Sequence, residues 1–253
     1  QSLNDESLKA IDRRHNSIEA IESIKIAKKT GLSISVDLMI GLPYQTKEDV
    51  KNFVDMVKEF EIPHVSVYML TLEDGTKLKR DYDAHKISLM DDDEKIELFD
   101  CAAKLLSQIG LDRYEVSNFA KPSFESKHNM RYWKREDYIG FGLSAHSLIL
   151  NHRFYNPSSF LGYYEAIDKG EVLHLDEAIL NEKDIEEEYI MLAFRTNDGI
   201  FLEDYKVKFG EDFLKKYEKA LDLHKNQLLI TKKTVSIKAN YLNVLNQIVI
   251  DFI

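Results

Sequence analysis

The front of the chain alternates between helical and strand-like patterns of apolar residues. Apolar positions recur at helical spacing over 17–29, and an apolar run over 34–40 predicts a buried strand that ends at Gly41. A helix capped by Thr46 follows, and then a second strand over 64–70. This order of helix, strand, helix and strand predicts parallel strands joined by right-handed crossovers.

The remaining pattern predicts shorter elements. These are a helix over 91–109, a strand over 113–117, a loop-rich stretch over 118–156, and helices over 158–169 and 182–194. Further on, helices over 201–208 and 211–224, a hairpin around Lys232 and Lys233 and a last helix are typical of a winged-helix-like module. We therefore expect three parts, residues 1–80, 81–180 and 181–253.

Composition narrows the class of protein. Of the 253 residues, 44% are apolar and 31% are charged, which is typical of a soluble globular chain. The formal net charge of −10 argues against binding to nucleic-acid backbones, so we expect no nucleic-acid partner. The single cysteine, Cys101, excludes a disulfide framework and indicates a reducing compartment, the cytoplasm; we expect a buried structural thiol.

Four strings of residues, in a fixed order, point to a known family. They are QSLND (1–5) with RRH (13–15), DLMIGLPYQT (37–46), YEVSNFAKP (114–122), and HNMRYW (128–133) followed by GFGLSAHS (140–147). Together they resemble the radical-SAM family of oxygen-independent coproporphyrinogen III oxidases and HemW-type haem chaperones. The string at 128–133 is characteristic of the HemW branch, which is therefore favoured.

The resemblance implies a fold and three cofactors. The fold class is α/β, with the C-terminal part of a partial (β/α)6 radical-SAM barrel, an α+β extension and the winged-helix-like module. The intact protein is expected to bind S-adenosylmethionine, a 4Fe-4S cluster and haem. The family's cluster-binding cysteines lie upstream of the matched strings and have no counterpart here. We therefore expect a missing front end and a chain that is inactive by itself.

Two sets of binding residues follow from the resemblance. The first set, for S-adenosylmethionine, is Gln1, Arg13, Asp37, Thr71 and His146. An arginine can hold the ligand carboxylate, and an aspartate can accept hydrogen bonds from its ribose or ammonium group. Gln1, Asp37 and Thr71 are expected at the carboxyl ends of strands, where barrels bind ligands. The residues alone favour a loop cap for Asp37 and a surface ion pair for Arg13.

The second set, for haem, is His128, Asn129, Tyr132 and Trp133, with His128 as the iron ligand. His146 and His152 are rival iron ligands, and Arg131, Arg135 and Arg153 are candidates for pairing with the haem propionates. The residues alone favour a packed loop with Trp133 in the core.

Three functions stay open. The favoured one is a HemW-like haem chaperone that delivers haem to haem-receiving proteins, with peripheral membrane association through those partners. The alternatives are a coproporphyrinogen III oxidase, which uses a radical derived from S-adenosylmethionine, and a non-enzymatic winged-helix interaction protein. Without the front strands, the edge of the strand over 34–40 and the apolar inner faces of the strands should be uncovered, so self-association is expected.

Overall fold

The structure is a computed structural model that describes residues 1–170 and 175–253. These residues form two compact units, Gln1–Glu125 and Ser126–Ile253. The division of the sequence at residues 80 and 180 stays a prediction.

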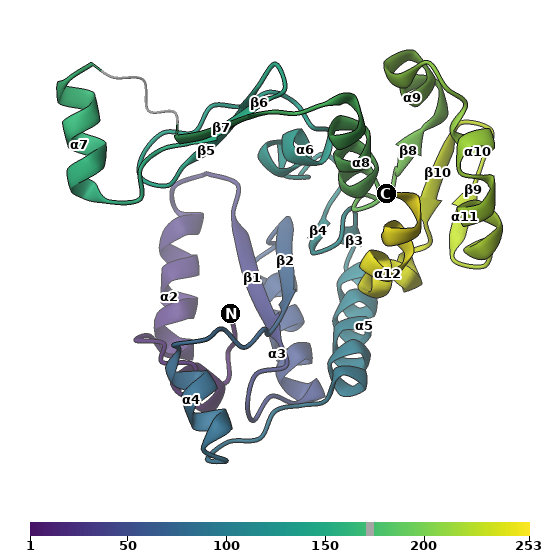
Figure 1. Ribbon diagram of the computed structural model, residues 1–253. Coiled ribbons are helices and arrows are strands. Elements are labelled where there is room, and N and C mark those ends of the chain that lie inside the picture. Colours follow the sequence, from purple (N-terminus) through teal and green to yellow (C-terminus); the bar gives the residue numbers. More distant parts are fainter. Residues whose placement is uncertain (171–174) are drawn as a thin grey trace. The chain divides into compact units, whose positions relative to one another are not determined.

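The first unit is a sheet with helices against it. Its strands are β1 (Ser35–Ile40), β2 (His64–Met69), β3 (Asp112–Arg113) and β4 (Asn118–Ala120), in the spatial order β1-β2-β4-β3 (Figure 1). The helices are α1 (Asp5–Ala10), α2 (Ser17–Lys28), α3 (Lys47–Glu59), α4 (Lys77–Asp83) and α5 (Asp92–Gln108). The predicted parallel pairing of β1 with β2 is confirmed, and β4 adds to β2 in the antiparallel sense. Among the described residues, β1 is an edge strand.

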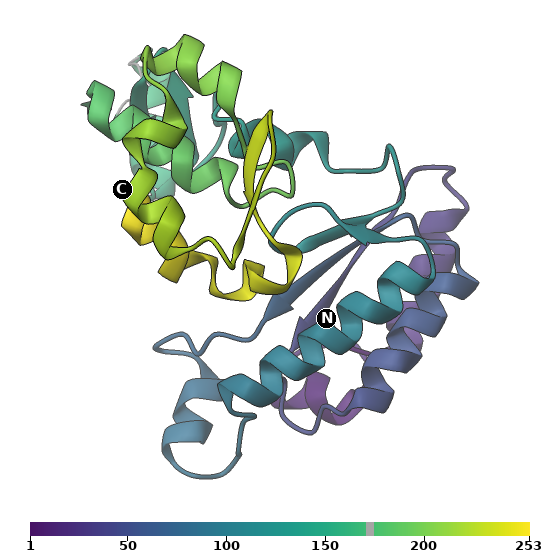
Figure 2. The same ribbon diagram turned by 90° about the vertical axis from the view of Figure 1, so that its right-hand side faces the viewer.

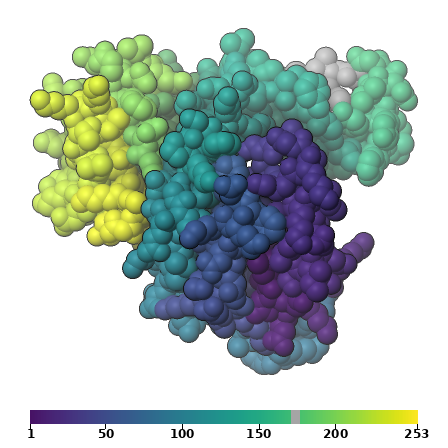
Figure 3. Space-filling view, turned by 180° about the vertical axis from the view of Figure 1, so that it is seen from behind, coloured from purple at the N-terminus to yellow at the C-terminus, as the bar shows by residue number. Residues whose placement is uncertain are grey.

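Helix α3 shows why the helices lie where they do. Thr46 and Asp49 form a capping box at its start, and its apolar side chains, including Phe53 and Val57, are buried. They pack with Leu38 and Val65 of the strands and with α5 in one core. Figure 2 shows α3 and α5 on the same face of the sheet, and Figure 3 shows this unit from behind, with α2 and α3 at its surface.

The opposite face of this sheet corrects one expectation. We expected apolar inner faces, but the alternation along β1 sends Leu38 and Ile40 into the core beneath the helices. The side chains of Ser35 and Asp37 then point to the other face, in register with His64 and Ser66 of β2. The face opposite α3 and α5 therefore carries these polar side chains beside Met39 and Tyr68, and the prediction of uncovered apolar inner faces was wrong, because Val36 and Leu38 pack in the core.

The predicted strand over 113–117 was also wrong. The chain reverses there, so that β3 and β4 pair with each other in the antiparallel sense. The carboxylate of the buried Glu115 accepts a hydrogen bond from the backbone N–H of Ser117 at 3.0 Å, and the Arg113 side chain donates to the carbonyls of Glu115 and Val116. These local bonds compete with a ladder and hold a turn.

The second unit begins with a hairpin sheet. Strands β5 (His146–Ile149), β6 (His152–Tyr155) and β7 (Leu175–Ile179) pair in that order, and Tyr138 forms an isolated bridge to Leu148. Helices α6 (Lys127–Trp133), α7 (Phe160–Asp168) and α8 (Glu182–Ala193) belong to the same unit. The stretch expected to be loop-rich therefore contains a helix and a hairpin, whose turn at Leu150 and Asn151 has positive φ at both residues.

The predicted winged-helix-like order follows α8. It consists of β8 (Ile200–Phe201), α9 (Leu202–Phe209), α10 (Phe213–Lys216), α11 (Glu218–Leu223), β9 (Leu228–Ile230) and β10 (Thr234–Ile237). Its sheet has the order β8-β10-β9, with β9 and β10 as the expected hairpin. The helix predicted over 211–224 is broken at Tyr217, and the last helix consists of η1 (Ala239–Val244), α12 (Leu245–Val249) and η2 (Ile250–Phe252).

Candidate functional site

Three residues matched to S-adenosylmethionine binding lie near one another in the first unit. The carbonyl of Gln1 accepts a hydrogen bond from the backbone N–H of Met39 in β1 at 2.8 Å. The carboxylate of Asp37 and the guanidinium of Arg13 both act electrostatically on the backbone nitrogen of Gln1. Both charged groups are therefore within electrostatic range of Gln1. A cation and an anion beside one backbone edge suit a zwitterionic ligand.

Asp37 is not at the carboxyl end of its strand, as we had expected. It is the third of the six residues of β1, and it pairs in register with Ser66. Its exposed carboxylate reaches the polar face because side chains alternate along the strand. Thr71 lies just beyond the end of β2 and is exposed, as predicted, whereas His146 belongs to the second unit.

The polar face also holds a histidine that the sequence did not single out. The Nδ1 atom of His64 lies 2.6 Å from Oγ of Ser35, and its Nε2 lies 2.9 Å from the hydroxyl of Tyr114. Burial lowers the pKa of His64, although Asp37 and Glu125 act to raise it. The ring is therefore held neutral between two hydroxyl groups. Ser35 and His64 are paired in register across β1 and β2, and this pairing could have identified the contact only if the strand register were already known.

The residues present do not fit an iron–sulfur cluster. Such clusters are held by several cysteine thiolates. Cys101 is the one cysteine in the sequence, and it lies half-buried on α5 rather than fully buried as expected. Within residues 1–170 and 175–253, no three histidine, cysteine or acidic side chains gather as a metal site.

In the second unit, α6 carries the histidine expected to bind haem. The hydroxyl of Ser126 accepts from the backbone N–H of Asn129 and caps the helix. His128 and Tyr132 are one turn apart, with their rings edge to face at 4.9 Å and the Tyr132 hydroxyl 3.1 Å from Nε2 of His128. The ring of Tyr138 packs against Tyr132 at 4.7 Å, and His128 is exposed.

The hairpin sheet continues this surface. Tyr138 bridges to Leu148, and Leu148 pairs with Arg153, so these three side chains form a row on one face of the sheet. Burial raises the pKa of Tyr138, and the charge of Arg153 opposes that shift. Leu148 is itself buried, so the accessible groups of this surface are His128, Tyr132, Tyr138 and Arg153, which we call the aromatic face. The sequence did not single out Tyr138, because only the sheet register brings it beside Tyr132.

His146 lies on the same sheet face, two residues from Leu148 along β5. It pairs across the hairpin with Tyr155, and the centres of the two rings are 5.2 Å apart. The other rival ligand, His152, pairs instead with Glu177 at 2.7 Å. The structure thus leaves His128 and His146 as the two histidines beside the aromatic surface.

One carboxylate, that of Glu188, joins Arg153 of the aromatic face to the buried Arg135. Glu188 of α8 accepts from Nε of Arg135 at 2.7 Å and also from Nη2 of Arg153. Arg135 donates through Nη1 to Asn151 at 2.9 Å, and its buried Nη2 has no hydrogen-bond partner in the described part of the chain. Two guanidinium groups therefore share one carboxylate.

Trp133 does not join the residues of the aromatic face. Successive helical residues are rotated by about 100°, so Trp133 points away from Tyr132. With Tyr189, Phe201 and Lys208 it lines a separate pocket of about 420 Å³, and the Arg195 guanidinium lies 5.8 Å from its ring centre. Asn129 is half-buried and lies on the same side of α6 as Trp133, because the two residues are four positions apart. The haem set predicted from the sequence therefore divides between two sides of α6.

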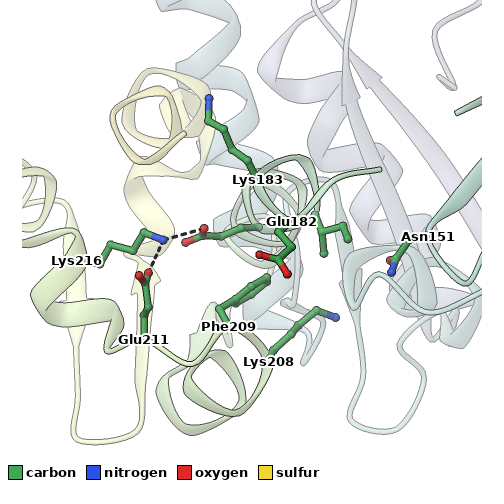
Figure 4. A pocket seen from close by; sticks show the side chains of 9 residues that line it. Asn151, Glu182, Lys183, Lys208, Phe209, Glu211 and Lys216 are labelled. Atoms are coloured by element: carbon green, nitrogen blue, oxygen red, sulfur yellow. Dashed lines mark hydrogen bonds and ion pairs between the residues drawn. The ribbon is translucent and has the colours of Figure 1, made fainter. Parts of the chain in front are cut away.

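A second pocket, of about 620 Å³, lies between α8, α9 and α10 (Figure 4). Its lining includes three acidic and three basic side chains, namely Glu182, Glu186, Glu211, Lys183, Lys208 and Lys216. Lys216 binds Glu186 at 2.9 Å and also contacts Glu211, as Figure 4 shows. Because these charges balance and largely pair with one another, the pocket favours no class of charged ligand.

None of the helices built from the described residues combines the length and apolar character needed to cross a bilayer.

Comparisons with known proteins identify relatives of this chain. A family model described as the HemN C-terminal domain matches residues 180–235. The heme chaperone HemW of Lactococcus lactis is 33% identical over 231 residues, which is 91% of this chain and 60% of that protein. The heme chaperone HemW of Haemophilus influenzae is 40% identical over 147 residues, covering 58% of this chain and 37% of that protein. This chain thus spans about 60% of the length of the Lactococcus relative.

A solved structure shares the fold. The coproporphyrinogen III oxidase HemN from Escherichia coli, a radical-SAM enzyme, superposes with a TM-score of 0.80. The superposition covers 100% of this chain and 62% of HemN, at 20% sequence identity. It supports the arrangement of the backbone and, at that identity, says nothing further of the chemistry.

Proposed function

Because the chain belongs to the family of HemW-type radical-SAM proteins, we propose that it is part of a haem chaperone that binds haem and passes it to haem-receiving proteins. The observation that carries the proposal is the aromatic face, where an exposed histidine lies against two packed tyrosine rings. Haem requires an iron ligand, flat apolar surface and partners for its propionates. Residues of each type lie together in the second unit.

In this proposal His128 supplies the iron ligand. A neutral imidazole binds iron through one ring nitrogen, while the other nitrogen makes the hydrogen bond that orients the ring. Nε2 of His128 lies 3.1 Å from the hydroxyl of Tyr132, so Nδ1 is the nitrogen that would bind the iron. Tyr132 then orients the ring, and Tyr138 supplies apolar surface beside it. Asn129 and Trp133 contribute through the packing of α6 rather than through contact with haem.

The cofactors of the whole family member belong to the same proposal. In the intact protein, Gln1, Arg13, Asp37 and Thr71 of the first unit hold S-adenosylmethionine, with Arg13 on its carboxylate and Asp37 on its ammonium or ribose group. S-adenosylmethionine there supplies radical chemistry in combination with a 4Fe-4S cluster. The cluster ligands come from residues other than those of this chain.

The test is a haem titration followed at the Soret band. The variants are His128→Ala, His146→Ala and His152→Ala, each compared with the unaltered chain. His128→Ala should weaken binding and shift the Soret band, because an axial ligand is lost. His152→Ala is the control, because that ring pairs with Glu177 instead. If His128→Ala binds haem as tightly with an unchanged spectrum, the assignment fails.

We also propose self-association through the edge of β1. Met39 bonds outward to Gln1, so the backbone groups of Asp37 and Ser35, two and four residues earlier, face the same edge. An open strand edge pairs readily with another strand. Ser35→Pro removes one outward N–H and should shift sedimentation toward the monomer. An unaltered chain that is already monomeric at high concentration contradicts the proposal.

A further inference from the structure

The three arginines that are candidates for pairing with the haem propionates differ in what they can reach. Arg131 is exposed on α6 and its ion pair with Glu136 is long, at 3.8 Å. The Arg135 side chain is only 4% exposed and is bound to Glu188 and Asn151. The Arg153 side chain is 39% exposed. Burial therefore removes Arg135 from contact with any ligand and leaves Arg153 within reach.

Positive charges outnumber negative charges in the pairing around Glu188. One of its carboxylate oxygens accepts from Arg135 and the other accepts from Arg153. Two positive groups thus share one negative group, and the Glu188 side chain is only 14% exposed. A partly buried positive charge is costly unless an anion compensates it. Of the two positive groups, only the guanidinium of Arg153 is accessible to a ligand. It has five N–H donors and uses one of them on Glu188.

The position of Arg153 indicates which kind of anion could bind to it. It stands in one row with Leu148 and Tyr138, and Tyr138 packs on Tyr132, whose hydroxyl meets His128. A ligand that covers these rings brings an acidic group at its rim to the guanidinium. Carboxylates match the forked geometry of arginine.

We propose that Arg153, held in place by Glu188, is the carboxylate-binding residue of the aromatic face and pairs with a propionate of haem. The inference rests on the proposed function, because it assigns a role within the same site. Glu188 acts as a positioning residue, since it orients Arg153 and is itself fixed by Arg135. Burial excludes Arg135 as a propionate partner, and the proposal assigns this role to Arg153 rather than to the exposed Arg131.

The experiment changes the ligand as well as the protein. Haem and haem dimethyl ester differ only in whether the propionates are ionised, so their affinity ratio isolates the carboxylate contact. Binding is followed by quenching of Trp133 fluorescence, because Trp133 is the one tryptophan in the sequence and follows Tyr132 directly. The unaltered chain should bind haem about tenfold more tightly than the ester, the size expected for one charge-assisted pair.

Arg153→Gln should remove this preference and leave ester binding unchanged. The variant should still fold, because Glu188 keeps its bond to Arg135. Arg153→Lys keeps the charge without the fork and should retain part of the preference. Arg131→Gln also removes one positive charge, here from α6, and this variant should retain the full preference for haem over the ester. Glu188→Gln should reduce the haem-to-ester ratio, which a purely structural role for Glu188 would not alter.

Several outcomes overturn the assignment. A preference for haem that survives Arg153→Gln, or that disappears in Arg131→Gln, shows that another residue binds the propionate. An unaltered chain that binds haem and its ester equally well shows that no carboxylate contact exists. If the unaltered chain binds neither ligand, the proposed haem site fails as a whole, and this result is distinct from the others.

Discussion

The carboxylate of Glu186 joins three side chains of the winged-helix-like module, and its removal should weaken that module. Glu186 accepts from the hydroxyl of Tyr205, from the hydroxyl of Tyr217 at 2.8 Å and from Lys216 at 2.9 Å. Its side chain is 12% exposed. Glu186→Ala leaves both hydroxyls without their acceptor, whereas Lys216 keeps its contact with Glu211.

The size of the effect follows from the burial of each partner. Tyr205 is fully buried, so its unpaired hydroxyl costs about 2 kcal/mol, and the half-buried Tyr217 adds about 1 kcal/mol. We expect Glu186→Ala to lower the free energy of unfolding by about 3 kcal/mol at neutral pH. Urea unfolding followed by Trp133 fluorescence measures this, because Trp133 and Glu186 belong to the same unit.

The effect should also depend on pH. Burial acts to raise the pKa of Glu186, but the hydrogen bonds from Tyr205, Lys216 and Tyr217 outweigh it and hold the pKa below its usual range. A lowered carboxyl pKa contributes stability above the unfolded value and loses it as pH falls through the folded value. The difference between Glu186→Ala and the unaltered chain should therefore shrink in acid.

A neighbouring substitution provides the control. Glu187→Ala removes a carboxylate from the same helix, where it forms only a surface pair with Lys183 at 2.9 Å. Such pairs contribute less than about 1 kcal/mol. If Glu186→Ala and Glu187→Ala unfold at the same urea concentration, the carboxylate of Glu186 does not hold the module together.

Three further predictions concern other parts of the chain. Anaerobic reconstitution should give no cluster absorbance, because Cys101 is the single cysteine, and a stoichiometric cluster would refute this. Gly199→Ala should lower the free energy of unfolding in urea by more than about 3 kcal/mol, because φ of Gly199 is +65° and a Cβ would collide with the Val235 carbonyl. The control is Gly210→Ala, which has φ +74° but open space around it and should lower the free energy of unfolding by only about 1 kcal/mol. Burial raises the pKa of Glu115, so the stability of the unaltered chain should fall relative to Glu115→Gln as pH rises from about 4 to about 8; parallel curves by circular dichroism would contradict this.

The secondary structure that the sequence predicted well rests on local signals. The strands β1 and β2 alternate apolar with polar residues, and this period of two predicts a strand with one face in the core. Thr46, Asp91 and Asn181 each start a helix through a capping box, so the beginnings of these helices could be located to within a residue or two. These signals depend on neighbours in the chain and need no knowledge of the fold.

The errors arose where a side chain acts on its own backbone or where distant segments meet. Glu115 interrupts a strand-like pattern, because its carboxylate binds the N–H of Ser117 and closes a turn. Tyr138 and Arg153 are fifteen residues apart in the numbering, and only their shared partner Leu148 places them in one row. No local pattern marks such a pair, because register is set by pairing across the sheet.

The string at 128–133 shows why a motif does not by itself define a site. A helix of seven residues turns by about 100° at each step, so its side chains leave in several directions. Spacing by four brings His128 onto Tyr132, and these rings meet the hairpin through Tyr138. Trp133, one step further, enters the pocket beside α8 instead. The same string therefore serves two purposes, because one side of α6 presents groups that suit a ligand while the other side anchors the helix on which they stand.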